Sequence, residues 1–167
     1  MDKNVLKKIS YGLYIVSSLK NGKFNGQIAN SVFQVTAEPV LIIASINKSN
    51  LTHEYISSSK IFTISILSQK ADFKFIGNFG FKSGRDVDKF SEVNFKILNS
   101  GAPVVIEKCS AWLECEVINS FDTPTHTLFL GKLVDSEIID DSEPLTYDYY
   151  QKVINGKTPP SATTYIK

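Results

Sequence analysis

The sequence predicts a mainly β protein with a few short helices, arranged as a closed or nearly closed, largely antiparallel barrel with helical caps. Two observations carry this prediction. Roughly six apolar or alternating segments are typical of strands, and most follow one another through turn sequences, which favours hairpin order. The few helical segments do not alternate regularly with the strands, which argues against a doubly wound parallel sheet. No glycine-rich nucleotide fingerprint follows any strand.

The first two strands are expected over residues 11–19 and 24–36. Apolar and other side chains alternate in the first segment, and Asn21-Gly22 then supplies a pair that tolerates positive φ in a two-residue hairpin. The second segment is interpreted as one long strand that stops at Glu38-Pro39. Asn30 would lie in the middle of that strand, where its amide needs partners that a planar heterocycle or a neighbouring loop could supply.

The next two strands are expected over residues 40–46 and 60–68, which are nearly continuous apolar runs. Between them the stretch SINKSNLTHEYI, residues 45–56, turns polar and predicts a short helix with Ser49 or Asn50 as its N-cap. This junction leaves helix N–H groups free at the positive end of the helix dipole. A cap alone would explain the hydroxyl residues, and a phosphate monoester held by the same donors would explain them too.

The second half of the chain predicts two more helices and a long hairpin. Residues 70–81 predict a helix with Phe73, Ile76 and Gly77 inward, and residues 82–90 form a polar connector. The remaining elements are a strand over 102–121, a turn at DTPT, a strand over 126–139, and a last helix over 143–156 that Asn155-Gly156 ends. His126 stands at the start of a strand, where a histidine is most often structural, yet it can change charge near neutral pH.

Composition excludes several classes of function. The 167 residues carry a net charge of +1, so no overall field recruits nucleic acid or an anionic membrane. A small barrel that binds nucleic acid is disfavoured, because no basic, aromatic-studded stripe is present. Cys109 and Cys115 form no metal-ligand motif and are interpreted as small buried apolar residues, so we expect no metal site. No secretory or transmembrane segment is apparent, which predicts a cytoplasmic protein.

Four segments together resemble the flavin reductase-like, FMN-binding split-barrel family, and most of all flavoredoxins and the flavin domain of high-molecular-weight rubredoxins. They are NGQIANSVFQVTAEPVLIIASINKSNLTHEYI, KSGRDVDKF, THTLFLGKL and LTYDYYQKVINGKTPPSATTY, in the order that the family uses. The resemblance implies an FMN-binding split β-barrel over residues 1–167 as a single domain, with no rubredoxin domain appended. It also implies a homodimer with FMN held near the subunit interface.

The resemblance also implies the site. By position, it places Asn30, Ser31, Val32 and Thr36 along the flavin ring, Ser45, Ile46 and Asn47 along the ribityl chain and ring edge, Lys48, Ser49 and Thr52 at the phosphate, Lys89 near the cofactor, and Tyr165 in a tail that folds over it. His126 would be the catalytic residue, beside the ring or the substrate. No metal is expected in the site.

The implied activity is hydride transfer from NADH or NADPH to FMN, followed by electron transfer to rubredoxin, free flavin or ferric iron. The alternative is an electron carrier of the flavoredoxin type that a partner protein reduces, without NAD(P)H activity of its own. Two departures weaken the analogy to reductases that release reduced flavin. Ile28 stands where many of them carry threonine, and Pro39-Val40 where many carry two prolines.

Overall fold

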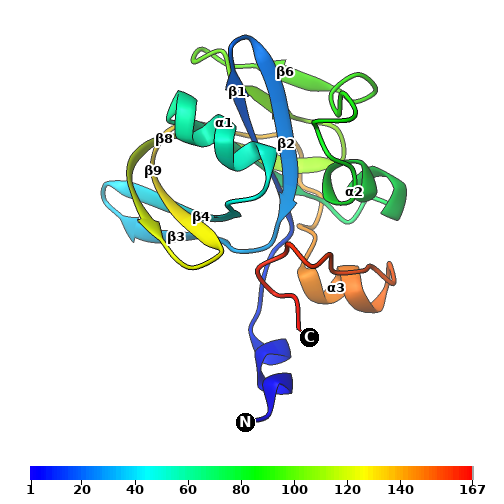
Figure 1. The fold of residues 1–167 in the computed structure, drawn as a ribbon. Helices are drawn as coiled ribbons and strands as arrows, with labels where there is room; N and C mark the ends of the chain where they lie inside the picture. Colours follow the sequence, from blue (N-terminus) through cyan, green and yellow to red (C-terminus); the bar gives the residue numbers. More distant parts are fainter. Residues whose placement is uncertain (167) are drawn as a thin grey trace.

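The computed structural model describes residues 1–166 (Figure 1). In chain order its elements are η1 (Lys3–Lys8), β1 (Tyr14–Lys20), β2 (Lys23–Ala29), β3 (Val32–Ala37), β4 (Val40–Asn47), α1 (Leu51–Ser59), β5 (Ile61–Leu67), α2 (Phe73–Gly80), β6 (Phe95–Ile97), β7 (Pro103–Val105), β8 (Cys109–Asp122), β9 (His126–Ile138) and α3 (Tyr147–Lys152). None of the helices in this part of the chain is long and apolar enough to cross a membrane.

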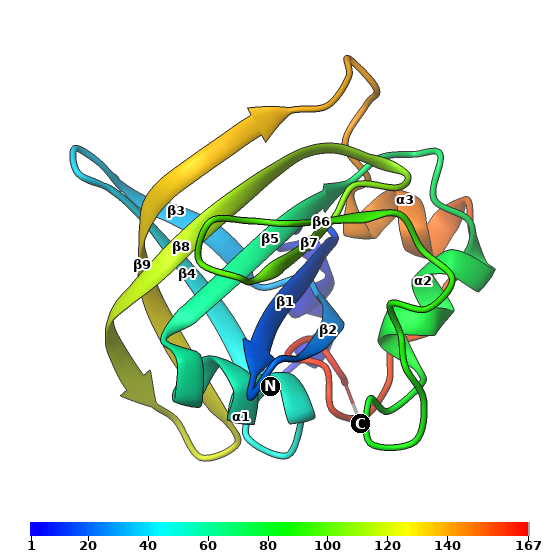
Figure 2. The ribbon, with the colours of Figure 1, turned by 90° about the horizontal axis from the view of Figure 1, so that it is seen from above.

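One antiparallel sheet with the order β2-β1-β5-β8-β9-β4-β3 forms the body of the molecule. Seen from above, its strands wrap around a common centre (Figure 2). The wrapping brings the two ends of the sheet together, and the Ser45 N–H donates to the Ser31 carbonyl across them at 3.0 Å. The short pair β6-β7 stands apart from this sheet. The predicted mainly β, antiparallel barrel with short helices is therefore confirmed.

The long strand expected over residues 24–36 is wrong, because the chain leaves the sheet at Asn30 and Ser31. β2 pairs with β1 at one edge, whereas β3 pairs with β4 at the other edge. The apolar alternation runs through both strands, so the sequence pattern carries no mark of the crossing. Asn30 consequently lies in a bend at the seam between the two edges instead of in the middle of a strand.

The hairpins follow the turn chemistry of the sequence. Asn21 and Gly22 have φ values of 51° and 72°, which allows the tight turn between β1 and β2. Glu38-Pro39 separates β3 from β4 as expected. The strand expected over 102–121 is in fact two, β7 and β8, since the chain turns at Lys108 with a φ of 55°. The short strand β6 lay within no predicted element.

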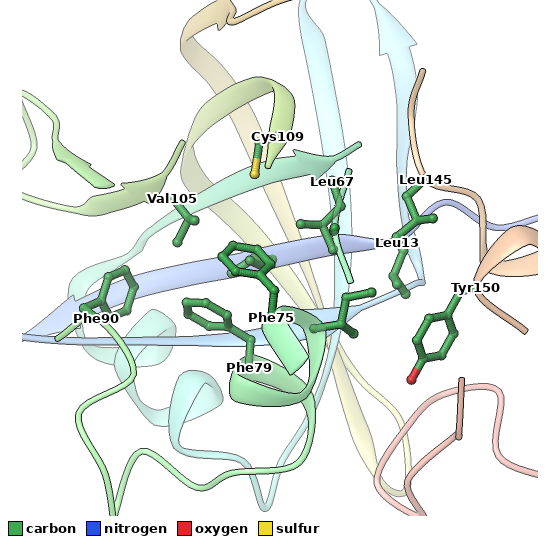
Figure 3. Close-up of a cluster of buried hydrophobic side chains, with 12 residues drawn as sticks. Leu13, Leu67, Phe75, Phe79, Phe90, Val105, Cys109, Leu145 and Tyr150 are labelled. Atoms are coloured by element: carbon green, nitrogen blue, oxygen red, sulfur yellow. The ribbon is translucent and has the colours of Figure 1, made fainter. Parts of the chain in front are cut away.

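Two clusters of buried side chains hold the molecule together. One lies inside the barrel and includes Ile46 and Phe62. The other joins the barrel wall to α2 and α3, with the rings of Phe75 and Phe79 near Leu67 (Figure 3). Both cysteines are buried free thiols, Cys109 in the second cluster and Cys115 in the first.

The predicted inward face of α2 is only partly right. Ile76 is buried, but Phe73 is 42% exposed and the buried aromatic rings are Phe75 and Phe79. The reason is the helix start: Asp72 is the N-cap, and its carboxylate accepts a hydrogen bond from the Phe75 N–H at 2.8 Å. This cap fixes the rotation of the helix and turns Phe73 toward solvent.

Candidate functional site

A cavity of about 320 Å³ lies where the barrel seam meets the helical caps. Its walls come from β2, the start of α1, the end of α2 with the loop at residues 81–85, the end of β4, and the C-terminal segment at residues 157–163. Sites for small molecules in proteins usually measure roughly 300–1,000 Å³. The cavity is therefore large enough for a mononucleotide-sized ligand.

Two buried amides close one end of this cavity against the C-terminal segment. The Asn30 Nδ2 donates to the Thr164 Oγ1 at 2.7 Å, and the Asn47 Nδ2 donates to the Ser161 carbonyl at 3.1 Å. The Asn30 Oδ1 accepts from the neighbouring Ser31 hydroxyl at 3.3 Å. This end presents amide groups that recognise polar ring edges, and the tail that covers it is tied to those same amides.

His126 reaches this end because its position on β9 pairs with Asn47 on β4. The Nδ1 lies 2.8 Å from the Thr125 Oγ1. Burial lowers the pKa of the imidazole below its usual value, and a hydrogen bond with the Ser161 backbone opposes that shift. The imidazole is consequently neutral at pH 7 and can hydrogen-bond a ligand without adding charge.

The start of α1 forms the opposite end of the cavity. Asn50 occupies the N-cap position, but its side chain donates to the Gln27 Oε1 at 3.1 Å instead of capping the helix. Thr52, which is almost fully buried, accepts a hydrogen bond from the Asn25 Nδ2 at 2.8 Å. The first N–H groups of a helix have no partner inside it, so this end of the cavity attracts an anion.

Two cationic side chains, Lys82 and Arg85, line the same end. The Arg85 Nη2 lies 3.5 Å from the Glu54 Oε2, in a partly exposed pair. Lys48, expected at the phosphate, does not line the cavity, and its Nζ lies 3.6 Å from the Asp122 Oδ2. The sequence reading took the Arg85 loop for a solvated connector, although the glycine before it, Gly84, was a signal of close packing.

Lys89 is a buried cation in the cavity wall, and only 5% of it is exposed. Its Nζ donates to the carbonyls of Gly26 at 2.9 Å and Phe79 at 3.2 Å. Among residues 1–166 no carboxylate forms a salt bridge with it. Burial lowers the pKa of this ammonium to about 8. Its third N–H remains available for a group in the cavity.

The structure brings most of the expected site residues to one cavity. Those that line it are Asn30, Ser45, Asn47, Ser49, Thr52, Lys89 and His126. Val32 and Ile46 instead point into the barrel core, and Ser31 contributes its carbonyl to the seam. Thr36 lies away from the cavity, where its hydroxyl donates to the Pro39 carbonyl, and Tyr165 lines a second cavity beside α3 and η1.

The sequence reading missed several wall residues, above all the aromatic pair Tyr147 and Tyr150 of α3. The Tyr150 hydroxyl donates to the Lys157 carbonyl at 3.0 Å, which anchors the C-terminal segment over the cavity (Figure 3). Gly156 lies directly against the Tyr150 ring, where a Cβ atom would come within 2.1 Å of it. The signal for this anchor was the Asn155-Gly156 helix end, which places the tail back over the helix.

Comparison with known proteins gives three close matches to the chain. The sequence model described as "Flavin reductase like domain" matches residues 6–154. The high molecular weight rubredoxin of Moorella thermoacetica is 44% identical over 99% of this chain and 72% of that protein. The ferric-chelate reductase (NAD(P)H) of Archaeoglobus fulgidus is 44% identical over 100% of this chain and 99% of that protein.

A solved structure agrees with these sequence matches. The flavin reductase PheA2 superimposes with a TM-score of 0.74 at 30% identity, over 87% of this chain and 93% of that one. The match covers the barrel and the elements that build the cavity.

Proposed function

Because the chain belongs to the flavin reductase-like family, we propose that it is an FMN-dependent oxidoreductase that takes hydride from NADH or NADPH and passes electrons to a separate acceptor. One observation carries the proposal. A single cavity has an anion-binding end at α1 and an amide-bearing end beside His126. FMN has the matching ends, a phosphate and a ring with imide edges.

The donor set of the cavity fits FMN residue by residue. Ser49, Thr52, Arg85 and the first N–H groups of α1 would hold the phosphate. Asn30, Ser45 and Asn47 would hold the ring edges and the chain between. Bound flavin supplies hydride acceptance and stepwise electron release, which no side chain of the protein can supply. The size of the cavity favours FMN over FAD, since a dinucleotide needs more space.

Lys89 and His126 would divide two tasks at the ring. The buried Lys89 ammonium provides positive charge that compensates negative charge on a reduced ring. The neutral His126 imidazole provides a hydrogen bond beside the ring without adding charge. The C-terminal segment, anchored by Tyr150, excludes water from this end. The acceptor would be rubredoxin, free flavin or ferric iron, and the cytoplasmic location that the sequence predicts stays a prediction.

The absorbance spectrum tests cofactor and donor together. The protein saturated with FMN should show the visible flavin bands, and these should bleach when NADH or NADPH is added without oxygen. Bleaching within milliseconds to seconds in a stopped-flow experiment supports the reductase. FMN binding without bleaching by either nicotinamide would instead support the carrier of the flavoredoxin type. A protein that binds no FMN would contradict both.

We also propose that the protein is a homodimer. Large apolar side chains are exposed on neighbouring strands, among them Phe33 on β3, Phe121 on β8 and Ile138 on β9, with Phe121 69% and Ile138 77% exposed. η1 has no buried residue and extends away from the barrel (Figure 1). Apolar surface of this kind is typical of a protein interface.

Sedimentation equilibrium tests the dimer. The parent should sediment at twice the mass of the 18.6 kDa chain, and Phe121→Asp should shift it toward the monomer, because a charge in an apolar interface is costly to desolvate. Val153→Asp on α3 is the matched control, since Val153 is also exposed but lies away from these strands. A parent that sediments as a monomer at micromolar concentration would contradict the proposal.

A further inference from the structure

Asn25 is a buried amide that is only half satisfied. It lies on β2, lines the cavity and is 2% exposed. Its Nδ2 donates to the Thr52 hydroxyl at 2.8 Å, but within residues 1–166 its Oδ1 has no hydrogen-bond partner. A buried carbonyl oxygen without a donor is rare in folded proteins, because removing it from water is unfavourable. Its presence in a cavity wall points to a ligand that donates to it.

The surroundings of this oxygen place it at the anion-binding end. Thr52 lies in the first turn of α1, and Gly84 immediately precedes Arg85 in the loop across the cavity. The Asn25 Oδ1 faces Gly84 so closely that a Cβ atom on that glycine would lie 1.9 Å from it. The orphan oxygen therefore sits among the groups that would hold the phosphate.

Hydrogen-bond polarity at the Asn25–Thr52 pair defines the ligand. Thr52 already accepts from the amide, so its own O–H is free to donate to an anionic oxygen. The Asn25 Oδ1 can only accept, and it needs a donor on the ligand. A phosphate dianion alone satisfies the threonine but not the amide. A hydroxyl on a carbon chain next to the phosphate satisfies both.

We propose that Asn25 is a positioning and specificity residue that accepts a hydrogen bond from a ribityl hydroxyl and so selects a polyol phosphate over a bare phosphate or a bare ring. This inference rests on the proposed flavin-binding function and adds to it the recognition of the chain between ring and phosphate. It also gives Gly84 a reason, since any larger residue would displace the amide from this position.

Three flavins that differ only in the side chain test the inference by equilibrium titration. FMN carries hydroxyls and phosphate, riboflavin carries the hydroxyls alone, and lumiflavin carries neither. Asn25→Leu should weaken the binding of FMN and of riboflavin about tenfold each, because a buried hydrogen bond is lost. Lumiflavin should bind the variant and the parent equally. Asn99→Leu, in an exposed turn, should leave all three affinities unchanged.

Asn25→Asp separates the hydroxyl from the phosphate. It keeps an acceptor oxygen but adds negative charge, so riboflavin should bind within threefold of the parent while FMN binds more than tenfold more weakly. Equal weakening of all three flavins in Asn25→Leu would mean a merely structural residue and overturn the inference. A loss confined to FMN in Asn25→Leu would mean that Nδ2 faces the phosphate, and would also overturn it. A parent that binds no flavin would overturn the proposed function itself.

Discussion

The free energy of unfolding should rise with pH by about 2.5 kcal/mol more in the flavin-free parent than in Lys89→Met, between pH 7 and pH 10. The buried Lys89 ammonium has a pKa of about 8 in the folded protein, against 10.5 for an ordinary lysine. Between these values the unfolded chain binds a proton that the folded chain has released. Stability therefore rises with pH through this window, and the variant lacks the contribution.

Chemical denaturation at a series of pH values measures this difference. Other groups titrate in both proteins, so their contributions cancel when the two curves are subtracted. Lys74→Met is the matched control, because Lys74 is an exposed lysine on α2 and its loss should leave the pH profile of the parent unchanged. Parallel profiles for the parent and Lys89→Met would mean that the Lys89 charge is solvated and is no buried cation for a reduced flavin.

Strand positions were largely predictable from the sequence, because half-buried and fully buried strands leave a periodic or continuous apolar pattern. β1, β4, β5 and β9 lie where that pattern places them. The crossing at Asn30 was not predictable in this way, since β2 and β3 continue one alternation while belonging to opposite sheet edges. Which edge a strand joins depends on contacts far apart in the sequence, and local periodicity is blind to them.

The candidate site was predictable where neighbouring residues in the chain are also neighbours in the cavity. Ser45, Asn47 and Ser49 run along one strand end into a helix start, and all three line the cavity. Lys48 lies among them in sequence, but it faces Asp122 on the β8 strand end instead. Proximity in sequence indicated the place and could not indicate the direction of each side chain.

The charge at the phosphate end was therefore assigned to the wrong element by the sequence reading of residues 45–56. The cation that lines the cavity comes from the loop after α2, which tertiary packing of Gly84 against Asn25 brings across to α1. That packing depends on one small residue and one buried amide, which no spacing rule connects. The proposed phosphate site thus combines a predicted helix start with a cation that only the fold could supply.

Arg85→Met should weaken FMN binding about 30-fold, or about 2 kcal/mol, while Lys48→Met weakens it less than threefold. Arg85 lines the anion-binding end, and its partly exposed pair with Glu54 at 3.5 Å is weak enough to give way to a phosphate dianion. Lys48 is the matched control, because it carries the same charge a few residues from the helix start but faces Asp122 at 3.6 Å.

Riboflavin, which has no phosphate, distinguishes a direct contact from a general loss of the site. Both variants should bind riboflavin as the parent does, since neither cation has a ligand charge to meet. Isothermal titration of the parent and the two variants with FMN and riboflavin measures all six affinities. Equal FMN affinity in the parent and Arg85→Met, or a larger loss in Lys48→Met, would return the phosphate to Lys48. The cavity wall at residues 82–85 would then be a loop that covers the site without binding the anion.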